Sequence, residues 1–164
     1  MHRCKIIHRD IKPENLVLDS QGYLRITDLG ISREYRQNNS NDTSGTPGYM
    51  APEVMNRKEH SYGVDYFALG VIAYEFMLGR RPYLGKDRKE IKENMLSKQA
   101  QVRIDELPYK WSPHAIDFIN RVLPFPFSCC SGIPRRDWAP TASKKSKPTP
   151  GWQICSGSGY NKKK

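Results

Sequence analysis

The charged and polar side chains that could do chemistry are concentrated in one short segment, residues 8–15. It reads His-Arg-Asp-Ile-Lys-Pro-Glu-Asn and stands directly before an apolar stretch. Two carboxylates, an amide, a lysine and an arginine this close together are costly to remove from water unless a ligand, a metal ion or mutual pairing satisfies them. Loops held on a rigid scaffold are also where catalytic groups gather. The segment is therefore a candidate catalytic loop, although Asp10 and Asn15 alone are a weak signal.

Two further motifs follow in order along the chain. Asp28-Leu29-Gly30 comes after a second apolar stretch, and residues 45–53 read Gly-Thr-Pro-Gly-Tyr-Met-Ala-Pro-Glu. Three ordered motifs are far more specific than any one of them. Together they resemble the eukaryotic protein kinases, which have an H-R-D-x-x-x-x-N catalytic loop, a D-F-G metal motif and an A-P-E motif. Leu29 in place of the usual phenylalanine is a tolerated apolar exchange.

The resemblance implies transfer of the γ-phosphate of ATP to a protein hydroxyl, with ATP and Mg²⁺ as cofactors. Negative charge gathers on the transferring group, so the catalyst needs a divalent metal, a cation and an aligned hydroxyl. Mg²⁺ takes oxygen ligands and keeps several waters, so few protein ligands suffice. By resemblance, Asn15 and Asp28 would be these ligands. Asp10 would orient the substrate hydroxyl and accept its proton, and Lys12 would meet the γ-phosphate.

Other positions place the chain with the serine/threonine kinases. Lys12, two residues after Asp10, is typical of that branch, and so is the Gly-Thr-Pro sequence around Thr46. The resemblance implies that Thr46 forms a hydrogen bond near Asp10 and Lys12. It also implies that Glu14 and Val17 lie against the ribose and adenine of ATP. For Val17, an ordinary buried strand residue is an equally good interpretation. Segment 79–83 and the helix after it look most like the AGC group.

Arg9 resembles the arginine of kinases in which a phosphothreonine orders the activation loop. Many relatives carry that threonine three residues before Gly45, where this chain has Asp42, followed by Thr43 and Ser44. Either Asp42 supplies a weaker fixed charge, or Thr43 or Ser44 is phosphorylated. An ordinary polar loop is an equally good interpretation.

The resemblance gives supporting roles to His8, Arg9, Glu53 and Asp65. Asp65 begins an apolar segment, and a buried acid there must be paired. It either braces the backbone of the catalytic loop or caps a helix N-terminus, and we favour the brace. In the family, an arginine beyond residue 123 pairs with Glu53. Arg135 or Arg136 could replace it, but nothing around them supports this.

Hydrophobic periodicity and turn residues predict the elements that must position these groups. Gly79 is a plausible helix C-cap, and Ser112-Pro113 is a helix-start signal. The predicted elements are two paired strands (16–18 and 23–27), a long loop (31–49), a short helical turn (50–56) and helices at 64–79, 87–98 and from 112 onward. We therefore expect a mainly α fold, the C-terminal lobe of a protein kinase, with a small β-hairpin at the catalytic loop.

The last quarter of the chain differs in composition from the rest. The chain has 27 Lys+Arg against 17 Asp+Glu, a net charge of +10, and residues 124–164 hold much of the excess. That stretch is rich in Pro, Gly and Ser and has no Leu, Val or Met, so it can bury too little to offset its ordering entropy. We expect a partial kinase domain at 1–123 and a disordered basic tail at 124–164. Scattered lysines are usually solvated, so we expect no specific nucleic-acid partner.

Other classes of protein are disfavoured. We find no secretory signal, and the longest apolar block, 64–78, is too short for a bilayer span and contains Asp65 and Glu75. The four cysteines form no C-x-x-C pair, so a disulfide framework or a zinc site has no support. We expect an intracellular, cytoplasmic protein that acts on a protein substrate.

The resemblance begins in the middle of a kinase domain. Kinases carry upstream a small lobe with a Gly-rich loop and a phosphate-gripping lysine, and neither precedes residue 8 here. We expect a fragment that is inactive alone, because the lobe that positions the nucleotide is missing. The alternative is a non-catalytic regulatory or binding module derived from a kinase C-terminal lobe.

Overall fold

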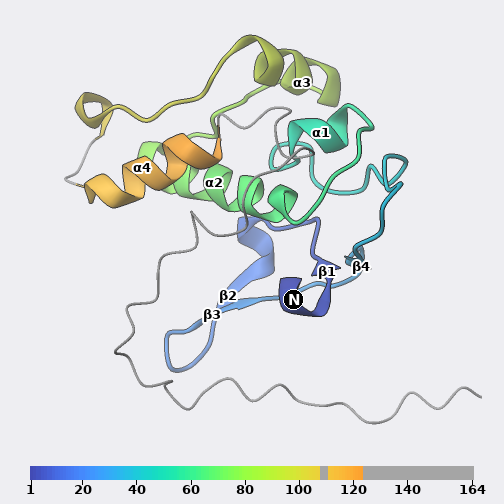
Figure 1. Cartoon of the computed structure of the whole chain (residues 1–164). Helices are drawn as coiled ribbons and strands as arrows, with labels where there is room; N and C mark the ends of the chain where they lie inside the picture. The colour runs from blue at the N-terminus through green and yellow to red at the C-terminus, as the bar shows by residue number, and fades with distance from the viewer. Residues whose placement is uncertain (108–110, 124–164) are drawn as a thin grey trace, which may run out of the picture. The chain divides into compact units, whose positions relative to one another are not determined.

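A computed structural model describes residues 1–107 and 111–123. The predicted disordered tail, residues 124–164, lies outside the described residues. Figure 1 shows short strands in the N-terminal part and helices after them. The elements are, in chain order, β1 (Ile6–Ile7), β2 (Leu16–Leu18), β3 (Leu24–Ile26), β4 (Arg33–Glu34), α1 (Pro52–Met55), α2 (Gly63–Leu78), α3 (Arg88–Ser97) and α4 (Pro113–Val122), with 3₁₀ turns at His2–Cys4, Pro13–Asn15 and Ile104–Glu106.

The strands of the described part form two small antiparallel sheets. β2 pairs with β3, with Leu16 opposite Ile26, which confirms the predicted hairpin. Its turn is closed by the Asp19 carboxylate, which accepts the backbone N–H groups of Gln21 and Tyr23 at 3.0 and 2.8 Å. Gly22 adopts φ 82° there, which an L side chain resists.

The second sheet pairs β1 with β4 and was not predicted. Ile6 lies opposite Glu34, and Ile7 lies opposite Arg33. The prediction of one uninterrupted loop at 31–49 is therefore wrong at β4. Two-residue strands show no periodicity, and their pairing partners are distant in sequence. The sheet places the start of the 31–49 segment beside the residue that precedes the catalytic loop.

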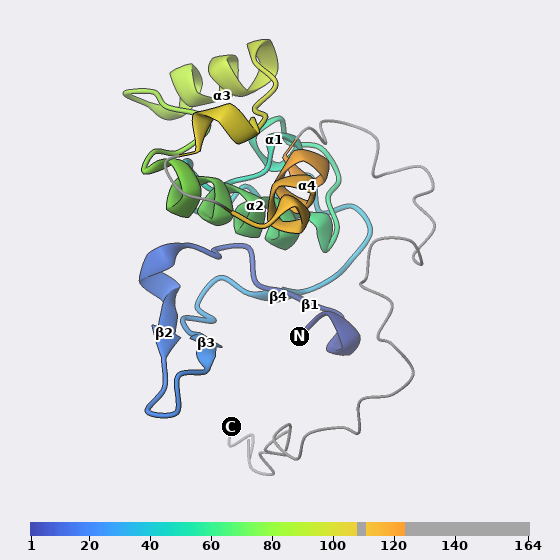
Figure 2. The same cartoon turned by 90° about the vertical axis from the view of Figure 1, so that its left-hand side faces the viewer.

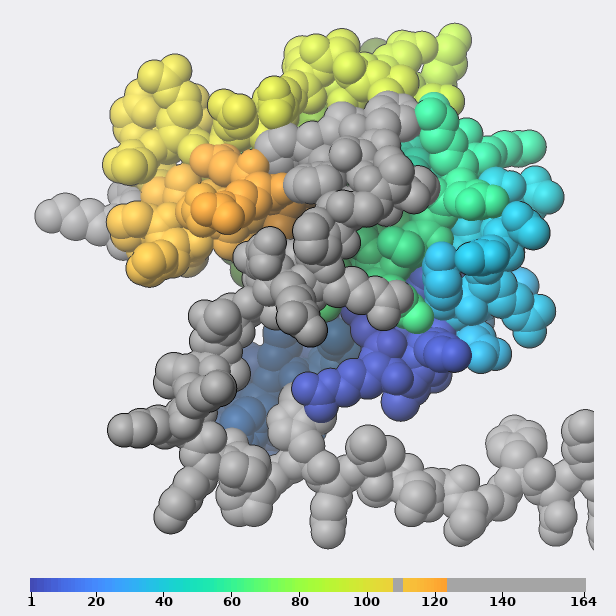
Figure 3. Space-filling view, in the orientation of Figure 1, coloured from blue at the N-terminus to red at the C-terminus, as the bar shows by residue number. Residues whose placement is uncertain are grey.

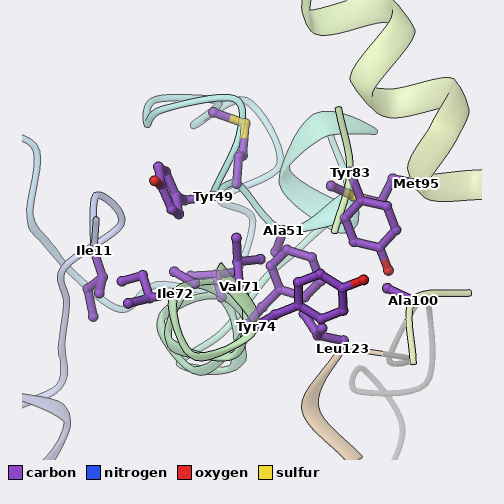
Figure 4. Close-up of a cluster of buried hydrophobic side chains, with 14 of the residues drawn as sticks. Ile11, Tyr49, Ala51, Val71, Ile72, Tyr74, Tyr83, Met95, Ala100 and Leu123 are labelled. Atoms are coloured by element: carbon purple, nitrogen blue, oxygen red, sulfur yellow. The ribbon is translucent and has the colours of Figure 1, made fainter. Parts of the chain in front are cut away.

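The α2 helix is the centre of the hydrophobic core. It was predicted at 64–79, and it ends at Gly79, whose φ of 69° makes it the left-handed C-cap. Val71 on α2 is fully buried. Figure 4 shows the core side chains gathered around this helix, with Ile11 on one side and Tyr83 and Met95 on the other. The core thus joins the catalytic loop to the later helices.

The α4 helix packs against α2. At Gly70 of α2, an added Cβ would lie 2.8 Å from a methyl carbon of Val122, so glycine permits the close approach. Ile116 and Ile119 of α4 are buried, and Ser112 caps the helix by accepting the His114 N–H, as the sequence predicted. Figure 2 shows α4 beside α2 from the side.

The α3 helix covers another part of the core. Asp87 caps it by accepting the Glu90 N–H at 2.8 Å. Ile91 and Met95 are buried, whereas Leu96, which the amphipathic pattern of residues 87–98 predicts on the same side as them, is 50% exposed. In the space-filling view, α3 and α4 lie above the N-terminal residues, which are blue (Figure 3). In residues 1–107 and 111–123, no helix is long and apolar enough to cross a bilayer.

Candidate active site

The Asp10 carboxylate is held from both sides in the loop between β1 and β2. Its Oδ1 accepts the Thr46 hydroxyl at 2.6 Å and the Thr46 backbone N–H at 3.1 Å. Its Oδ2 lies 2.8 Å from Lys12 Nζ and 3.3 Å from Asn15 Nδ2. Lys12 also donates to the Thr46 hydroxyl at 3.1 Å. The structure thus brings together four of the residues predicted from sequence.

The electrostatics of this cluster keep both charges in place. Burial alone would raise the pKa of Asp10, but hydrogen bonds from Lys12 and Thr46 outweigh it and lower the pKa. The pKa of Lys12 is raised, chiefly by its hydrogen bond to Asp10. At neutral pH Asp10 is therefore an acceptor and Lys12 a cation.

Asn15 connects the loop to the end of β3. Its backbone carbonyl accepts the Thr27 N–H at 2.9 Å, and its Nδ2 donates to the Asp10 carbonyl oxygen at 2.8 Å. Because Nδ2 faces Asp10, the Oδ1 atom, which can coordinate a cation, lies on the opposite side of the amide. His8 also holds Thr27, since its Nε2–H donates to the Thr27 carbonyl at 3.0 Å.

Asp28 follows this anchored Thr27. Its φ is 59°, a left-handed conformation, and its Oδ1 accepts the Gly30 N–H at 3.1 Å. Its charge contributes to the raised pKa of Lys12, so the two side chains share one electrostatic environment. Asp28 and Asn15 supply oxygen donors only, which fits a hard cation such as Mg²⁺. In the described residues, no group of three or more His, Cys, Asp or Glu could hold a metal.

The hairpin presents an apolar surface beside this cluster. Val17 is 44% exposed, so it is not an ordinary buried strand residue. Glu14 is exposed as well. We define the hairpin surface as the exposed apolar residues Val17, Leu18, Leu24, Ile26 and Leu29. Leu18, Leu24 and Ile26 lie on one face of the hairpin and Val17 on the other, because successive side chains of a strand alternate. Exposed apolar side chains gathered on one small element are typical of an interaction site.

Asp65 lies under the catalytic loop at the start of α2. It is 2% exposed and accepts the backbone N–H groups of His8 and Arg9 at 2.9 and 2.8 Å. His2 Nε2 donates to the same carboxylate at 2.7 Å. The side chain caps no helical N–H group, because α2 has no side-chain cap. Arg9 has φ 70°, so the brace restrains a residue in an uncommon conformation.

Arg9 points to the start of the 31–49 segment. Its Nε and Nη2 donate to the Ile31 carbonyl at 2.8 and 2.6 Å. Its Nη1 lies 3.5 Å from Asp42, and Arg33 lies 3.7 Å from the other oxygen of Asp42. Burial lowers the pKa of Arg9, and the Asp42 charge opposes this. Asp42 thus pairs with two arginines, whereas the Thr43 carbonyl accepts a 3.5 Å bond from Arg88.

Two of these contacts were missed by the sequence prediction. Arg33 reaches Asp42 only because β4 pairs with β1. Asn39 and His60 form a second link, since Asn39 Nδ2 donates to the His60 carbonyl at 2.7 Å and Asn39 Oδ1 accepts the His60 N–H at 2.9 Å. No local pattern signals either contact.

Glu53 stands in the α1 helix without a salt bridge in the described part of the chain. Burial raises the pKa of its carboxyl. Arg135 and Arg136, its suggested partners, lie outside the described residues.

Comparison with known proteins agrees with the motifs. The protein kinase domain family matches residues 1–126. Rhodopsin kinase GRK1 of Rattus norvegicus is 39% identical over 129 residues, which cover 75% of this chain and 22% of that protein. Ribosomal protein S6 kinase 2 beta of Xenopus laevis is 47% identical over 92 residues, 55% of this chain and 15% of that protein. Serine/threonine-protein kinase Sgk1 of Homo sapiens is 38% identical over 105 residues, 63% of this chain and 24% of that protein.

The chain thus spans between 15% and 24% of the length of these relatives. They are serine/threonine kinases of the AGC type, which confirms the predicted subgroup of the resemblance. Because the protein kinase domain family matches three quarters of its residues, the chain belongs to the protein kinase family.

Proposed function

We propose that residues 1–123 form the C-terminal lobe of a serine/threonine protein kinase, whose full-length form transfers the γ-phosphate of ATP to protein Ser/Thr hydroxyls. The observation that carries this proposal is the Asp10 carboxylate, ionised and fixed by Thr46, Lys12 and Asn15. A carboxylate held in this way can accept a hydrogen bond from an incoming hydroxyl and then its proton. Since its other contacts are fixed, it needs little reorganisation at the moment of reaction.

The neighbouring residues suit the remaining requirements of phosphoryl transfer. Lys12 presents a cation beside the base, where the transferring phosphoryl group would lie. Asn15 Oδ1 and the Asp28 carboxylate would hold Mg²⁺, which neutralises phosphate charge when bound. Glu14 and Val17 are exposed on the side of the hairpin and would contact the ribose and adenine. His8, Arg9 and Asp65 would act as positioning residues, because they hold the loop backbone.

We further propose that the 164-residue chain is inactive in phosphotransfer by itself. The hairpin surface is exposed within the described residues, so an adenine bound there would be covered on one side only. Loss of positioning removes several kcal/mol of barrier lowering, roughly 7 or more in favourable cases. The same exposed surface supports the alternative, a non-catalytic regulatory or binding module derived from a kinase lobe.

Nucleotide binding separates the two proposals. The binding of a fluorescent ATP analogue to the full chain should depend on Mg²⁺ and should fall at least tenfold in Asp28→Asn. Asp105→Asn is the matched control, because Asp105 is exposed and makes one surface ion pair with Arg103. Binding that is insensitive to both Mg²⁺ and Asp28→Asn would contradict the assigned ligands. No binding at all would favour the non-catalytic module.

Phosphotransfer tests the proposed inactivity. The purified chain, incubated with radiolabelled ATP, Mg²⁺ and a generic protein substrate, should give no more product than Asp10→Asn. Metal-dependent phosphorylation that Asp10→Asn abolishes would show that the chain alone is an active kinase.

A further inference from the structure

An arginine that no motif includes lies over the segment next to Asp10. The Arg81 guanidinium carbon is 5.7 Å from the centre of the Tyr49 ring, within cation–π range. It also lies over Gly48, where an added Cβ would overlap with the guanidinium group. Glycine at position 48 therefore leaves room for the guanidinium where it lies.

This arginine is close to the proposed base. The Tyr49 N–H donates to the Thr46 carbonyl at 2.9 Å, and the Thr46 hydroxyl is bound to Asp10. Figure 4 shows Tyr49 at the edge of the core cluster, on the side where Ile11 of the catalytic loop lies. An extended peptide advances about 3.3 Å per residue. When its acceptor hydroxyl reaches Asp10, which contacts Thr46, a residue beside the acceptor can reach the 46–49 segment that carries Tyr49.

The two charged groups around Tyr49, Glu75 and Arg81, differ in whether they already have a partner. Glu75 on α2 accepts the Tyr49 hydroxyl at 2.7 Å, so one of its oxygens is already occupied. Burial and the bond to Glu75 raise the pKa of Tyr49, so the tyrosine remains a donor to Glu75 at physiological pH. Arg81 has no carboxylate within ion-pair distance in the part of the chain that the structure describes. Arg81 also donates no hydrogen bond in that part of the chain, so its planar N–H fork remains available to a bidentate partner.

We propose that Arg81 is a specificity-determining residue that binds an acidic side chain next to the phosphate acceptor of the protein substrate. This inference rests on the proposed function, because it requires the acceptor hydroxyl to lie at Asp10. Glu75 and the exposed Glu14 act in the opposite sense, since they favour a basic flank. We expect Arg81 to prevail over Glu75, because one Glu75 oxygen already accepts the Tyr49 hydroxyl, whereas Arg81 has no carboxylate within ion-pair distance among the described residues.

The test uses the full chain with a magnesium-bound, non-hydrolysable ATP analogue and three fluorescent peptides. The peptides share a central serine and differ only in its flanking residues, which are all Glu, all Gln or all Arg. By fluorescence anisotropy, the Glu peptide should bind about fivefold tighter than the Gln peptide, the factor of a favourable partly exposed ion pair. The Arg peptide should bind most weakly.

Two variants should abolish this preference by different routes. Arg81→Gln removes the charge, and Gly48→Ala displaces the arginine while retaining it. Arg80→Gln is the matched control, because Arg80 is exposed and adjacent but makes no contact with Tyr49 among the described residues. Thermal melts followed by circular dichroism show whether each variant is folded.

The outcomes are distinguishable from failure of the proposed function. The role of Arg81 would be overturned if Arg81→Gln left the ratio of the affinities for the Glu and Gln peptides unchanged. It would also be overturned if the chain preferred the Arg peptide, bound the three peptides equally or bound none of them. Loss of Mg²⁺-dependent nucleotide binding in the unsubstituted chain would instead refute the proposed function itself.

Discussion

Replacing Asp65 by asparagine tests whether the brace under the catalytic loop holds the site. The two backbone donors use different oxygens, since Arg9 N–H donates to Oδ1 and His8 N–H to Oδ2. Asparagine retains one acceptor but turns an N–H₂ group toward the second donor. Oδ2 also accepts His2 Nε2, so an amide nitrogen in its place removes the charge-assisted bonds from His8 and His2, whereas one in place of Oδ1 removes the bond from Arg9. In either orientation one buried backbone donor is left unsatisfied.

The expected loss follows from these two terms. A hydrogen bond to a charged group contributes about 1.5–3 kcal/mol, and an unsatisfied buried donor costs about 1–3 kcal/mol. Because the asparagine relaxes in part, we expect Asp65→Asn to lower the free energy of unfolding by about 2–4 kcal/mol. Total stabilities are about 5–15 kcal/mol, so this is a large fraction.

Urea denaturation followed by far-UV circular dichroism measures the loss, and amide hydrogen exchange locates it. The N–H groups of His8 and Arg9 should lose protection, because their acceptors are gone or weakened. Asp117→Asn is the control, since it removes an exposed acid paired with Arg121 and should cost less than about 0.5 kcal/mol. If Asp65→Asn is as stable as this control and the two amides stay protected, the bracing role is wrong.

Three further changes have defined outcomes. Burial raises the pKa of Glu53, so ionisation of this carboxyl at neutral pH opposes folding. Glu53→Gln should therefore be more stable than the parent at neutral pH. Urea titrations should show this difference in unfolding free energy fading as the pH falls toward about 4. Asp42→Asn leaves the guanidinium of Arg9, whose side chain is 5% exposed, without its counter-charge and should cost about 1–3 kcal/mol in urea. If Asp42 is the fixed charge, mass spectrometry of the folded protein should find no phosphate on Thr43 or Ser44, and phosphate there would favour the modified loop. Gly79→Ala forces a left-handed φ on alanine and should lower the free energy of unfolding, measured in urea, by about 1 kcal/mol. An unchanged free energy of unfolding would mean that the helix ends differently.

Local signals were sufficient for most of the elements. The cap residues Gly79 and Ser112 mark helix ends in the sequence and adopt those roles in the structure. These signals work because a cap needs only residues within one turn of it. The gathering of Asp10, Lys12, Asn15 and Thr46 was anticipated from the family resemblance, since spacing alone cannot bring Thr46 to Asp10.

Contacts between distant segments could not be predicted. The β1–β4 pairing, the Asn39–His60 link and the position of Arg81 over Tyr49 each depend on how separate elements pack. For Asp65, the sequence required a partner but allowed two. Only the direction of its carboxylate, toward the backbone of the catalytic loop, distinguishes a brace from a cap.

The small size of the β2–β3 hairpin has a consequence for affinity. A two-stranded ribbon is only marginally stable, and every residue of β3 is exposed. When the binding-competent conformation is populated only in part, the apparent dissociation constant equals the intrinsic one divided by that population. Under the proposed function, the turn residue Asp19, which bonds Gln21, Tyr23 and Arg25 but none of the proposed ligand-binding groups, would contribute to ATP affinity by stabilising the hairpin.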